Sequence, residues 1–369
     1  MKKLNRREFL GPIAASTAAL MTSGSGLASG RGAAQAGGGS RASGKLLNAY
    51  YLRANMYTLV PRHVREDLEW MADAGTNVVS VAILEQDFFA AQQNVELIRR
   101  EATRLKMKVF ATASRWGGLV AGAPKVPSLF SALHPETWVL NRDGSPAKFV
   151  KTSGVMSSVY HPATYEFFCQ SADKLFQELG VDGVTWDEPK AFRPDYSRAA
   201  LEQLGPNPTR SDFTKGAANF YARVSHYTRQ HHPDKTINLF LMATNTDEEA
   251  RAASAIPDLD YFGCDGRPWS AAAELAEARK QGRAERHPKV LVGRGEFFLN
   301  LARQHGKKGL LLAETFSMPA SMIPVMDAGL EQVLALQPDQ LIYYYYGRNT
   351  EDPDRTMAVV ARHIRKFLG

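Results

Sequence analysis

The chain has 369 residues, of which 22% are charged and 44% hydrophobic, and 45 Lys and Arg against 38 Asp and Glu give a formal net charge of +7. These proportions are ordinary for a globular protein and exclude a collagen, an acidic disordered chain and a coiled coil. Two cysteines, Cys169 and Cys264, are too few for a scaffold held together by disulfides. The length suits one large α/β domain or two modest ones.

Much of the positive charge lies at the N-terminus, where residues 1–36 carry a net +4. Two lysines and the pair Arg6 and Arg7 precede a short apolar run that is rich in small residues. This arrangement, with an Ala-Gln-Ala cleavage site at 34–36, is typical of a secretory signal, and a basic disordered arm is the alternative. The apolar run is too short to span a membrane, so we expect no membrane anchor in the mature protein.

The run Asn5-Arg-Arg-Glu-Phe-Leu10 resembles the twin-arginine export motif. This resemblance implies that the twin-arginine translocase carries the protein to the periplasm or to the exterior. Residues 37–45 are rich in glycine and serine and indicate a flexible linker. From residue 37 onward the chain carries a net charge of only +3. A charge this small gives weak support to nucleic-acid binding, so we expect no nucleic-acid partner. The predicted organisation is a signal at 1–36, a linker at 37–45 and one catalytic domain at 46–369.

From Leu46 onward, short apolar runs alternate with amphipathic segments. The runs predict strands at 47–55, 77–84, 108–114, 181–189, 236–242, 259–265, 309–315 and 340–347. Helices are predicted between them, including one that begins at Pro61 and one that begins with a capping box of Thr246 and Glu249. The segment 289–306 fits either a ninth strand at 290–292 or a loop that leads into a helix, and we favour the loop.

Eight strand–helix units in strict alternation predict an α/β fold, a (β/α)8 TIM barrel with long βα loops after strands 3 and 4. The alternative is an open doubly wound sheet, which usually has a glycine-rich phosphate-binding turn after its first strand. Residues 55–61 follow the first strand here and contain no glycine, and the lone Gly293-Arg-Gly295 pattern is weak as a nucleotide site. The histidines show none of the spacings of a metal centre, so we expect neither a metal ion nor a cofactor.

In such a barrel the active site lies at the carboxyl ends of the strands and in the loops that follow them. Carboxylates occupy several of these positions. Asp187 and Glu188 end the fourth strand, Asp265 ends the sixth and Glu314 ends the seventh. These four residues are the candidate catalytic groups.

Aromatic and polar residues accompany these carboxylates at the strand ends. Those that we expect to bind substrate are Arg53, Asn55, Glu85, Trp116, Trp186, Arg267, Trp269, Tyr345 and Arg348. Tryptophan beside carboxylates suits a sugar, because the C–H face of the ring stacks on the indole while its hydroxyls bond to charged groups. Arg53, Arg115 and Arg348 are candidates for binding an acidic sugar, although solvated loop arginines explain each of them equally well.

Strand alternation separates Asp187 from Trp186 on the fourth strand. We expect the bulky residues on the face of Trp186 to point toward the helices. The small and polar residues that share a face with Asp187 then point toward the barrel axis. This arrangement places Asp187 inside the barrel and predicts that Glu188 leans the other way.

The run Gly180-Val-Asp-Gly-Val-Thr-Trp-Asp187 resembles the fourth-strand signature of barrel glycoside hydrolases of the α-galactosidase and α-glucosidase type. In those enzymes the Asp that closes this strand is the nucleophile, so the resemblance implies that role for Asp187. Their acid/base is an Asp at the end of the sixth strand, and Asp265 occupies the matching place. The segments that begin at His134 and His161 are also similar to parts of such enzymes.

A second resemblance competes with the first. Trp186-Asp-Glu-Pro189 is similar to the Asn-Glu-Pro that closes the fourth strand in the β-glycosidase and cellulase superfamily. That resemblance implies that Glu188 is the acid/base and that Glu314 is the nucleophile. Asp187 departs from the pattern, because that superfamily has an asparagine there that contacts the 2-hydroxyl of the sugar. A carboxylate in its place puts like charge beside the acid and raises the pKa of the acid.

Both resemblances require two carboxyl groups that flank the glycosidic bond, one of them kept protonated by its surroundings. We favour Asp187 with Asp265 over Glu188 with Glu314, and other strand-end carboxylates are further alternatives. The expected function is an exported glycoside hydrolase that acts on an oligo- or polysaccharide by retention. The alternative is a non-catalytic carbohydrate-binding barrel protein.

Overall fold

The computed structural model describes residues 44–51, 58–122, 125–150, 153–283 and 288–368. The chain divides into two units, Met1–Arg41 and Ala42–Gly369, and the described residues belong to the second. The predicted signal, most of the predicted linker, and both Arg53 and Asn55 therefore lie outside the described residues. No helix in the described ranges is long and apolar enough to cross a membrane.

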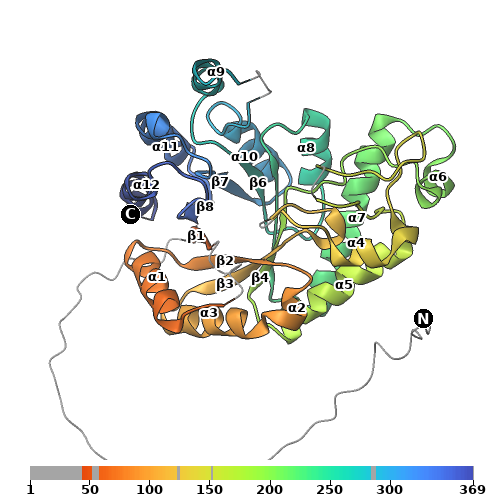
Figure 1. The fold of residues 1–369 in the computed structure, drawn as a ribbon, viewed down its shortest axis with the longest axis horizontal. Coiled ribbons are helices and arrows are strands. Elements are labelled where there is room, and N and C mark those ends of the chain that lie inside the picture. Colours follow the sequence, from red (N-terminus) through yellow and green to blue (C-terminus); the bar gives the residue numbers. More distant parts are fainter. Residues whose placement is uncertain (1–43, 52–57, 123–124, 151–152, 284–287, 369) are drawn as a thin grey trace, which may run out of the picture. The chain divides into compact units, whose positions relative to one another are not determined.

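Eight parallel strands follow one another around a closed barrel, in which β8 pairs with β1 (Figure 1). The strands are β1 (Leu46–Tyr51), β2 (Val78–Ile83), β3 (Lys108–Ala113), β4 (Gly183–Asp187), β5 (Thr236–Met242), β6 (Tyr261–Gly266), β7 (Lys308–Ala313) and β8 (Gln340–Tyr345). The predicted (β/α)8 TIM barrel is confirmed. The alternative of an open doubly wound sheet is excluded, since an open sheet would leave two edge strands unpaired.

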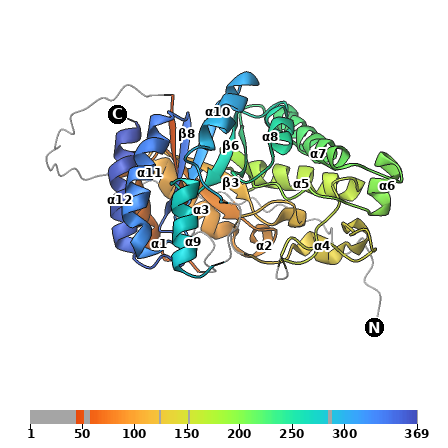
Figure 2. The ribbon, with the colours of Figure 1, turned by 90° about the horizontal axis from the view of Figure 1, so that it is seen from above.

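Helices alternate with the strands and lie around the barrel, as two perpendicular views show (Figures 1 and 2). They are α1 (Pro61–Asp73), α2 (Asp87–Ala90), α3 (Gln92–Arg104), α4 (Leu129–Leu133), α5 (Pro162–Gln177), α6 (Arg198–Leu204), α7 (Arg210–His231), α8 (Asp247–Ser254), α9 (Ala271–Lys280), α10 (Gly295–Gln304), α11 (Ile323–Ala335) and α12 (Pro353–Phe367), with short 3-10 helices η3 (Trp116–Gly118), η4 (Pro135–Thr137) and η5 (Ala320–Met322). Pro61 begins α1 and the predicted capping box begins α8. The segment after residue 288 leads into α10, as favoured, with a single bridge between Val290 and Arg267.

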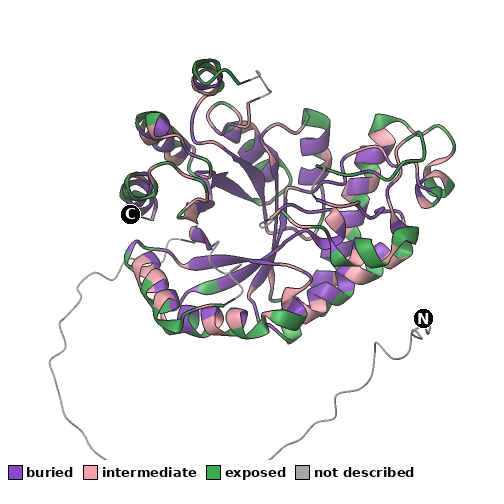
Figure 3. Cartoon of the chain, in the orientation of Figure 1, coloured by how far each residue is buried: buried purple, intermediate pink, exposed green. Residues whose placement is uncertain are grey.

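The barrel wall separates two hydrophobic layers. The larger layer lies between strands and helices, where the strands are buried and the exposed residues gather on the outer faces of the helices (Figure 3). A smaller layer fills the barrel interior with Tyr50, Ala82, Phe240, Tyr261, Leu310, Leu312 and Ile342. Trp186 belongs to the outer layer, whereas Thr185 bonds to Asn238 of β5, so the predicted alternation along β4 holds up to Asp187. Cys169 and Cys264 are buried free thiols.

Gly263 marks a close approach of two strands beside the carboxyl end of the barrel. A Cβ atom at this position of β6 would lie 1.6 Å from the carbonyl oxygen of Leu310 on β7. Only glycine fits so close to a neighbouring backbone, because any side chain would force the two strands apart. Asp265 stands two residues further along the same face of β6, so the separation of β6 and β7 also determines where its carboxyl group lies.

Candidate active site

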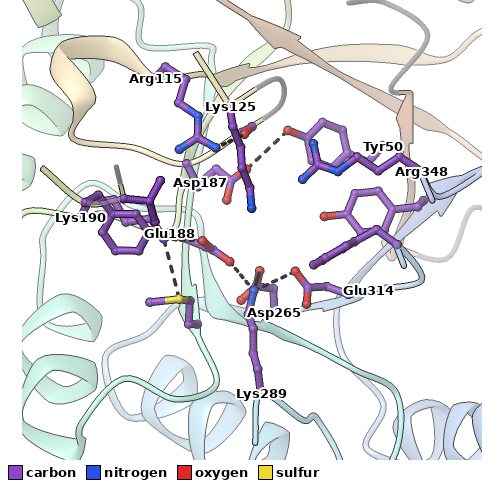
Figure 4. Close-up of a pocket in the computed structure, with 17 residues that line it drawn as sticks. Tyr50, Arg115, Lys125, Asp187, Glu188, Lys190, Asp265, Lys289, Glu314 and Arg348 are labelled. Atoms are coloured by element: carbon purple, nitrogen blue, oxygen red, sulfur yellow. Dashed lines mark hydrogen bonds and ion pairs between the residues drawn. The ribbon is translucent and has the colours of Figure 1, made fainter. Parts of the chain in front are cut away.

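A cavity of about 190 Å³ opens at the carboxyl ends of the strands (Figure 4), with room for on the order of a dozen water-sized groups. Its lining includes the four predicted catalytic carboxylates, Asp187, Glu188, Asp265 and Glu314. They come from the ends of β4, β6 and β7 or from the residues directly after them. The prediction that these groups meet at one end of the barrel is confirmed, because all parallel strands end there.

The ammonium group of Lys289 lies among three of these carboxylates (Figure 4). It donates hydrogen bonds to Glu188 Oε1, to Asp265 Oδ2 at 2.6 Å and to Glu314 Oε1 at 2.8 Å. Burial alone would lower the pKa of Lys289, but the three carboxylates raise that pKa well above its usual range, so the side chain stays charged. Lys289 therefore compensates part of a buried cluster of like charge.

Glu188 binds a second lysine, because Lys190 Nζ donates to its Oε2 atom and the Lys190 side chain is only 3% exposed. Burial alone would raise the pKa of Glu188, but the charges of Lys190 and Lys289 hold that pKa well below its usual range. Glu188 has a φ of 41°, in the left-handed region, where the alternation of β4 ends. The prediction that Glu188 leans away from Asp187 is therefore wrong, and both side chains line the same pocket.

Asp187 and Asp265 are buried carboxyl groups with raised pKa values. One carboxyl oxygen of Asp187, one of Asp265 and one of Glu188 lie within 4.8 Å of one another. Burial, and then the charge of Glu188, raises the pKa of Asp187 to about 7 and the pKa of Asp265 well above its usual range. The Tyr50 hydroxyl donates to Asp187 Oδ2 at 3.4 Å. Asp187 therefore changes its protonation state near neutral pH, and the raised pKa of Asp265 favours the protonated form of that group.

Cations surround Asp187 on the opposite side of the pocket from Lys289. Arg115 and Lys125 from the segment after β3 and Arg348 from the segment after β8 converge there (Figure 4). Arg348 follows β8, and its guanidinium lies 5.4 Å from the centre of the Phe316 ring. The pocket thus has one side where carboxylates surround a lysine and another where cations surround a carboxyl group.

The aromatic side chains of the pocket differ from the predicted ones. Tyr50 and Tyr344 stack with their ring centres 5.3 Å apart, and Phe316 meets Tyr344 edge-on at 6.3 Å. The prediction that Trp116 and Trp186 bind substrate is wrong, since both are fully buried outside the pocket in the layer between strands and helices. The same alternation that points Asp187 into the barrel points Trp186 away from it.

Glu85 has a structural role instead of the predicted contact with substrate. Its carboxylate lies outside the pocket and accepts hydrogen bonds from the Gly117 amide at 2.9 Å, the Ser128 hydroxyl at 2.7 Å and the Phe130 amide at 2.6 Å. These three donors belong to the long segment between β3 and α5. Glu85 therefore fastens that segment to the end of β2.

Three further predicted substrate-binding residues also lie outside the pocket, each bound to another partner. Arg267 donates to the carbonyl oxygen of Phe316 and stacks on its ring, Trp269 donates to a carboxylate of α9 at 2.8 Å, and Tyr345 donates to a carboxylate of α1 at 2.9 Å. The structure does not place these residues in the lining of the pocket. Of the residues predicted to bind substrate, Arg348 and the acidic-sugar candidate Arg115 line the pocket in the part of the chain that the structure describes.

The sequence patterns did not point to the three lysines of the pocket, Lys125, Lys190 and Lys289, or to Tyr50 and Tyr344 as lining residues. Lys190 stands two residues after Glu188 in the loop that follows β4, so the rule that selected strand-end carboxylates could also have selected it. Lys289 gave no such signal, because it precedes an apolar run on a segment outside the eight strands. Its carbonyl oxygen accepts from the Arg267 amide, and this contact beside the end of β6 brings its side chain to the pocket.

Among the described residues, Asp187, Glu188 and Asp265 form a group of oxygen ligands that could hold a cation. Carboxylate oxygens suit a hard ion such as Ca²⁺ or Mg²⁺. However, the Lys289 ammonium already contacts two of the three carboxylates. A metal ion at this place would have to displace a protonated lysine.

Replacing Lys289 with methionine tests this compensation of charge. We expect the free energy of unfolding to fall by about 3–5 kcal/mol at pH 8, because three buried carboxylates lose their common cation. The loss should shrink as the pH falls toward 5, since Glu188, no longer held ionised by this lysine, can then be protonated. Urea unfolding of the wild type and the variant at pH 8 and at pH 5 measures this loss of unfolding free energy. The exposed Lys280→Met on α9 is the control, and an equal, pH-independent effect of both substitutions would contradict the interpretation.

The comparisons with known proteins support the fold. No family model matches the sequence, and no curated protein matches it. Among solved structures, the chain is similar to the β-galactosidase of the Antarctic haloarchaeon Halorubrum lacusprofundi, with a TM-score of 0.61 and 14% identity over 87% of this chain and 58% of that one. It is also similar to the catalytic domain of the β-amylase of Paenibacillus polymyxa, with a TM-score of 0.59 and 8% identity over 88% and 98%.

A third similar structure is the endo-1,4-β-mannanase of Rhizomucor miehei, with a TM-score of 0.54 and 11% identity over 88% of this chain and 94% of that one. The chain spans less than two thirds of the β-galactosidases that it matches. At these identities the similarity concerns the fold. The structural neighbours of this barrel are TIM-barrel glycoside hydrolases.

Proposed function

We propose that this protein is a glycoside hydrolase that retains anomeric configuration, with Asp187 as the nucleophile and Asp265 as the acid/base. The observation that carries the proposal is the pairing of two buried carboxyl groups from β4 and β6, with an oxygen of each within 4.8 Å of the other. Retaining enzymes hold their carboxyl groups roughly 5–5.5 Å apart, whereas inverting enzymes leave 6.5–9.5 Å for a water molecule. The short separation favours retention.

The reaction proceeds in two steps. Asp265 gives its proton to the glycosidic oxygen while the carboxylate of Asp187 attacks the anomeric carbon, so the bond to the leaving group breaks and a glycosyl ester of Asp187 forms. Asp265 then takes a proton from a water molecule, and the resulting hydroxide attacks the same carbon and releases Asp187. The Tyr50 hydroxyl holds the Asp187 oxygen in place through its hydrogen bond.

The protonation states support this pair over Glu188 with Glu314. An acid/base must hold a proton before the first step, and burial together with the charge of Glu188 raises the pKa of Asp265. Glu188 cannot meet this requirement, because the charges of Lys190 and Lys289 hold its pKa well below its usual range even though it is buried. In this proposal Glu188 keeps Asp265 protonated and does not itself transfer the proton.

The substrate is an oligo- or polysaccharide, and the pocket offers what a sugar ring requires. The rings of Tyr344 and Phe316, which contact each other, supply aromatic surface, and the charged groups of the lining can bond to hydroxyls. The solved structures that share this fold also support a sugar substrate, since those described above are named for sugar-cleaving activities. At their low sequence identity this support rests on the fold.

Replacing Asp187 with asparagine should reduce kcat by about 10³-fold or more, because an amide cannot form the ester. Release of sugar from α- and β-aryl glycosides and natural polysaccharides measures the effect. Asp247→Asn is the matched control, since Asp247 begins α8 at the same end of the barrel but lies outside the pocket. Near-normal rates in the Asp187 variant would contradict its role as nucleophile. Binding of saccharides by the wild type without release would favour a non-catalytic carbohydrate-binding barrel.

The pH profile of kcat/KM distinguishes a nucleophile from an acid at position 187. A nucleophile must be ionised, and the pKa of Asp187 is raised to about 7 by burial and by the charge of Glu188. Activity should therefore increase about tenfold per pH unit below pH 7 and level off above it, until Asp265 loses its proton at higher pH. Rates of an aryl glycoside between pH 5 and pH 9 measure this. A decrease of activity through pH 7 would instead make Asp187 the acid.

We also propose that the protein is exported by the twin-arginine pathway to the periplasm or the exterior, on the strength of the motif around Arg6 and Arg7. Substituting both arginines by lysine should leave the enzyme inside the cell, because the translocase recognises the arginine pair. Activity and immunoblots of cell fractions measure the distribution. A mutation of Lys2 and Lys3 to glutamine is the control, and export of the arginine variant at the wild-type level would contradict the proposal.

A further inference from the structure

The charges of the pocket are unevenly distributed. Five cationic side chains and four carboxyl groups line it. Lys190 and Lys289 are bound to Glu188, and Lys289 also binds Asp265 and Glu314, so these charges compensate one another. The remaining cations, Arg115, Lys125 and Arg348, face a single carboxyl group, that of Asp187 (Figure 4).

Two of these cations, Lys125 and Arg348, are arranged to meet a ligand and not a protein carboxylate. In the described part of the chain, no carboxylate lies within ion-pair distance of Lys125 or Arg348. Arg348 rests on the ring of Phe316, which leaves its N–H groups directed to the sides. Arg115 is 7% exposed, and its terminal nitrogen donates to the carbonyl oxygen of Gly122 at 2.8 Å. That carbonyl fixes the guanidinium beside the pocket without neutralising its charge.

The backbone also fixes the position of Arg115. Its φ of 62° lies in the left-handed region, an unfavourable conformation for a residue with a side chain. Hydrogen bonds join the Arg115 amide to the Ala121 carbonyl at 3.0 Å, and the Ala121 amide to the Asp187 carbonyl at 2.7 Å. The loop that carries Arg115 is therefore attached to the end of β4, next to the proposed nucleophile.

We infer that the substrate of this site is a sugar that carries an anionic group, a carboxylate or a sulfate ester, which binds between Arg115, Lys125 and Arg348. The inference rests on the proposed function for the identity of the ligand as a sugar. Arginine and lysine donors that converge in a partly buried pocket bind an anion through charge-assisted hydrogen bonds. A neutral sugar would leave Lys125 and Arg348 without an anionic partner.

The carboxylate arrangement is consistent with an acidic substrate. Lys289 and Lys190 compensate the charges of Glu188 and Glu314, and the raised pKa of Asp265 favours its neutral form, so an anion that enters the pocket does not meet four negative groups. The pocket can therefore bind a negative ligand next to its catalytic carboxyl groups.

Calorimetric titration of the purified protein tests the inference with matched sugars. The pairs are glucuronate with glucose and galacturonate with galactose, and glucose 6-sulfate distinguishes a sulfate from a carboxylate. We expect the acidic member of at least one pair to bind at least tenfold more tightly, with an affinity that falls as ionic strength rises. Hydrolysis of the corresponding 4-nitrophenyl glycosides is measured in parallel.

The variants Arg348→Gln and Lys125→Gln remove one cation each, the first at a partly exposed position and the second at an exposed one. Each should reduce the ratio of acidic to neutral affinity by about tenfold, because a charge-assisted hydrogen bond is lost. Arg62→Gln on the outer face of α1, where the side chain is 75% exposed, is the control and should leave the ratio unchanged.

The possible outcomes separate the inference from the proposed function. Equal or tighter binding of neutral sugars, with ratios unaffected in both variants, would overturn the inference. If neutral glycosides are then cleaved, the proposed function stands. Selective binding of acidic sugars that depends on Arg348 or Lys125, without cleavage of any glycoside, would support the anion site and overturn the hydrolase.

Discussion

The contact of one lysine with three carboxylates is the constraint on which the rest of the site depends. Closing a parallel barrel brings the ends of β4, β6 and β7 together, and each of these strands contributes an acidic side chain there. Buried carboxylates this close repel one another and lose the hydration that stabilises their charge. Lys289 reduces this cost by hydrogen bonding to Glu188, Asp265 and Glu314 at once.

The protonation of the site follows from how the lysines are shared. Glu188 contacts both Lys190 and Lys289 and stays ionised. Asp265 shares one lysine with two other carboxylates and retains a proton, because burial and the neighbouring charge of Glu188 outweigh that single cation. Asp187 is bonded to a neutral tyrosine hydroxyl and titrates near neutral pH. Side chains of one chemical type thus acquire different acidities from their environments, as acid/base catalysis requires.

Sequence patterns predicted the features that follow from local geometry. The alternation of apolar runs with amphipathic segments was sufficient for the barrel, and the end of each strand located Asp187, Asp265 and Glu314. The same reasoning placed aromatic residues wrongly. A tryptophan near a strand end can face the pocket or the helices, and Trp116 and Trp186 fill the outer layer because the helices leave large apolar spaces there. A carboxylate near a strand end can likewise bind either a ligand or a loop, and Glu85 binds the loop between β3 and α5.

The amino-acid sequence by itself therefore determined the order of strands and helices, the closed barrel and the end of it at which acidic side chains gather. Hydrophobic periodicity and the positions of strand ends depend on residues that are close together in the chain, so both can be identified from the sequence alone. Only the tertiary structure decided which residues face the pocket and which of them are charged. Lys289 lies 101 residues after Glu188 in the chain, yet its ammonium binds that carboxylate. Such a contact depends on how distant segments pack, and burial and the partners that packing supplies set the pKa of each group.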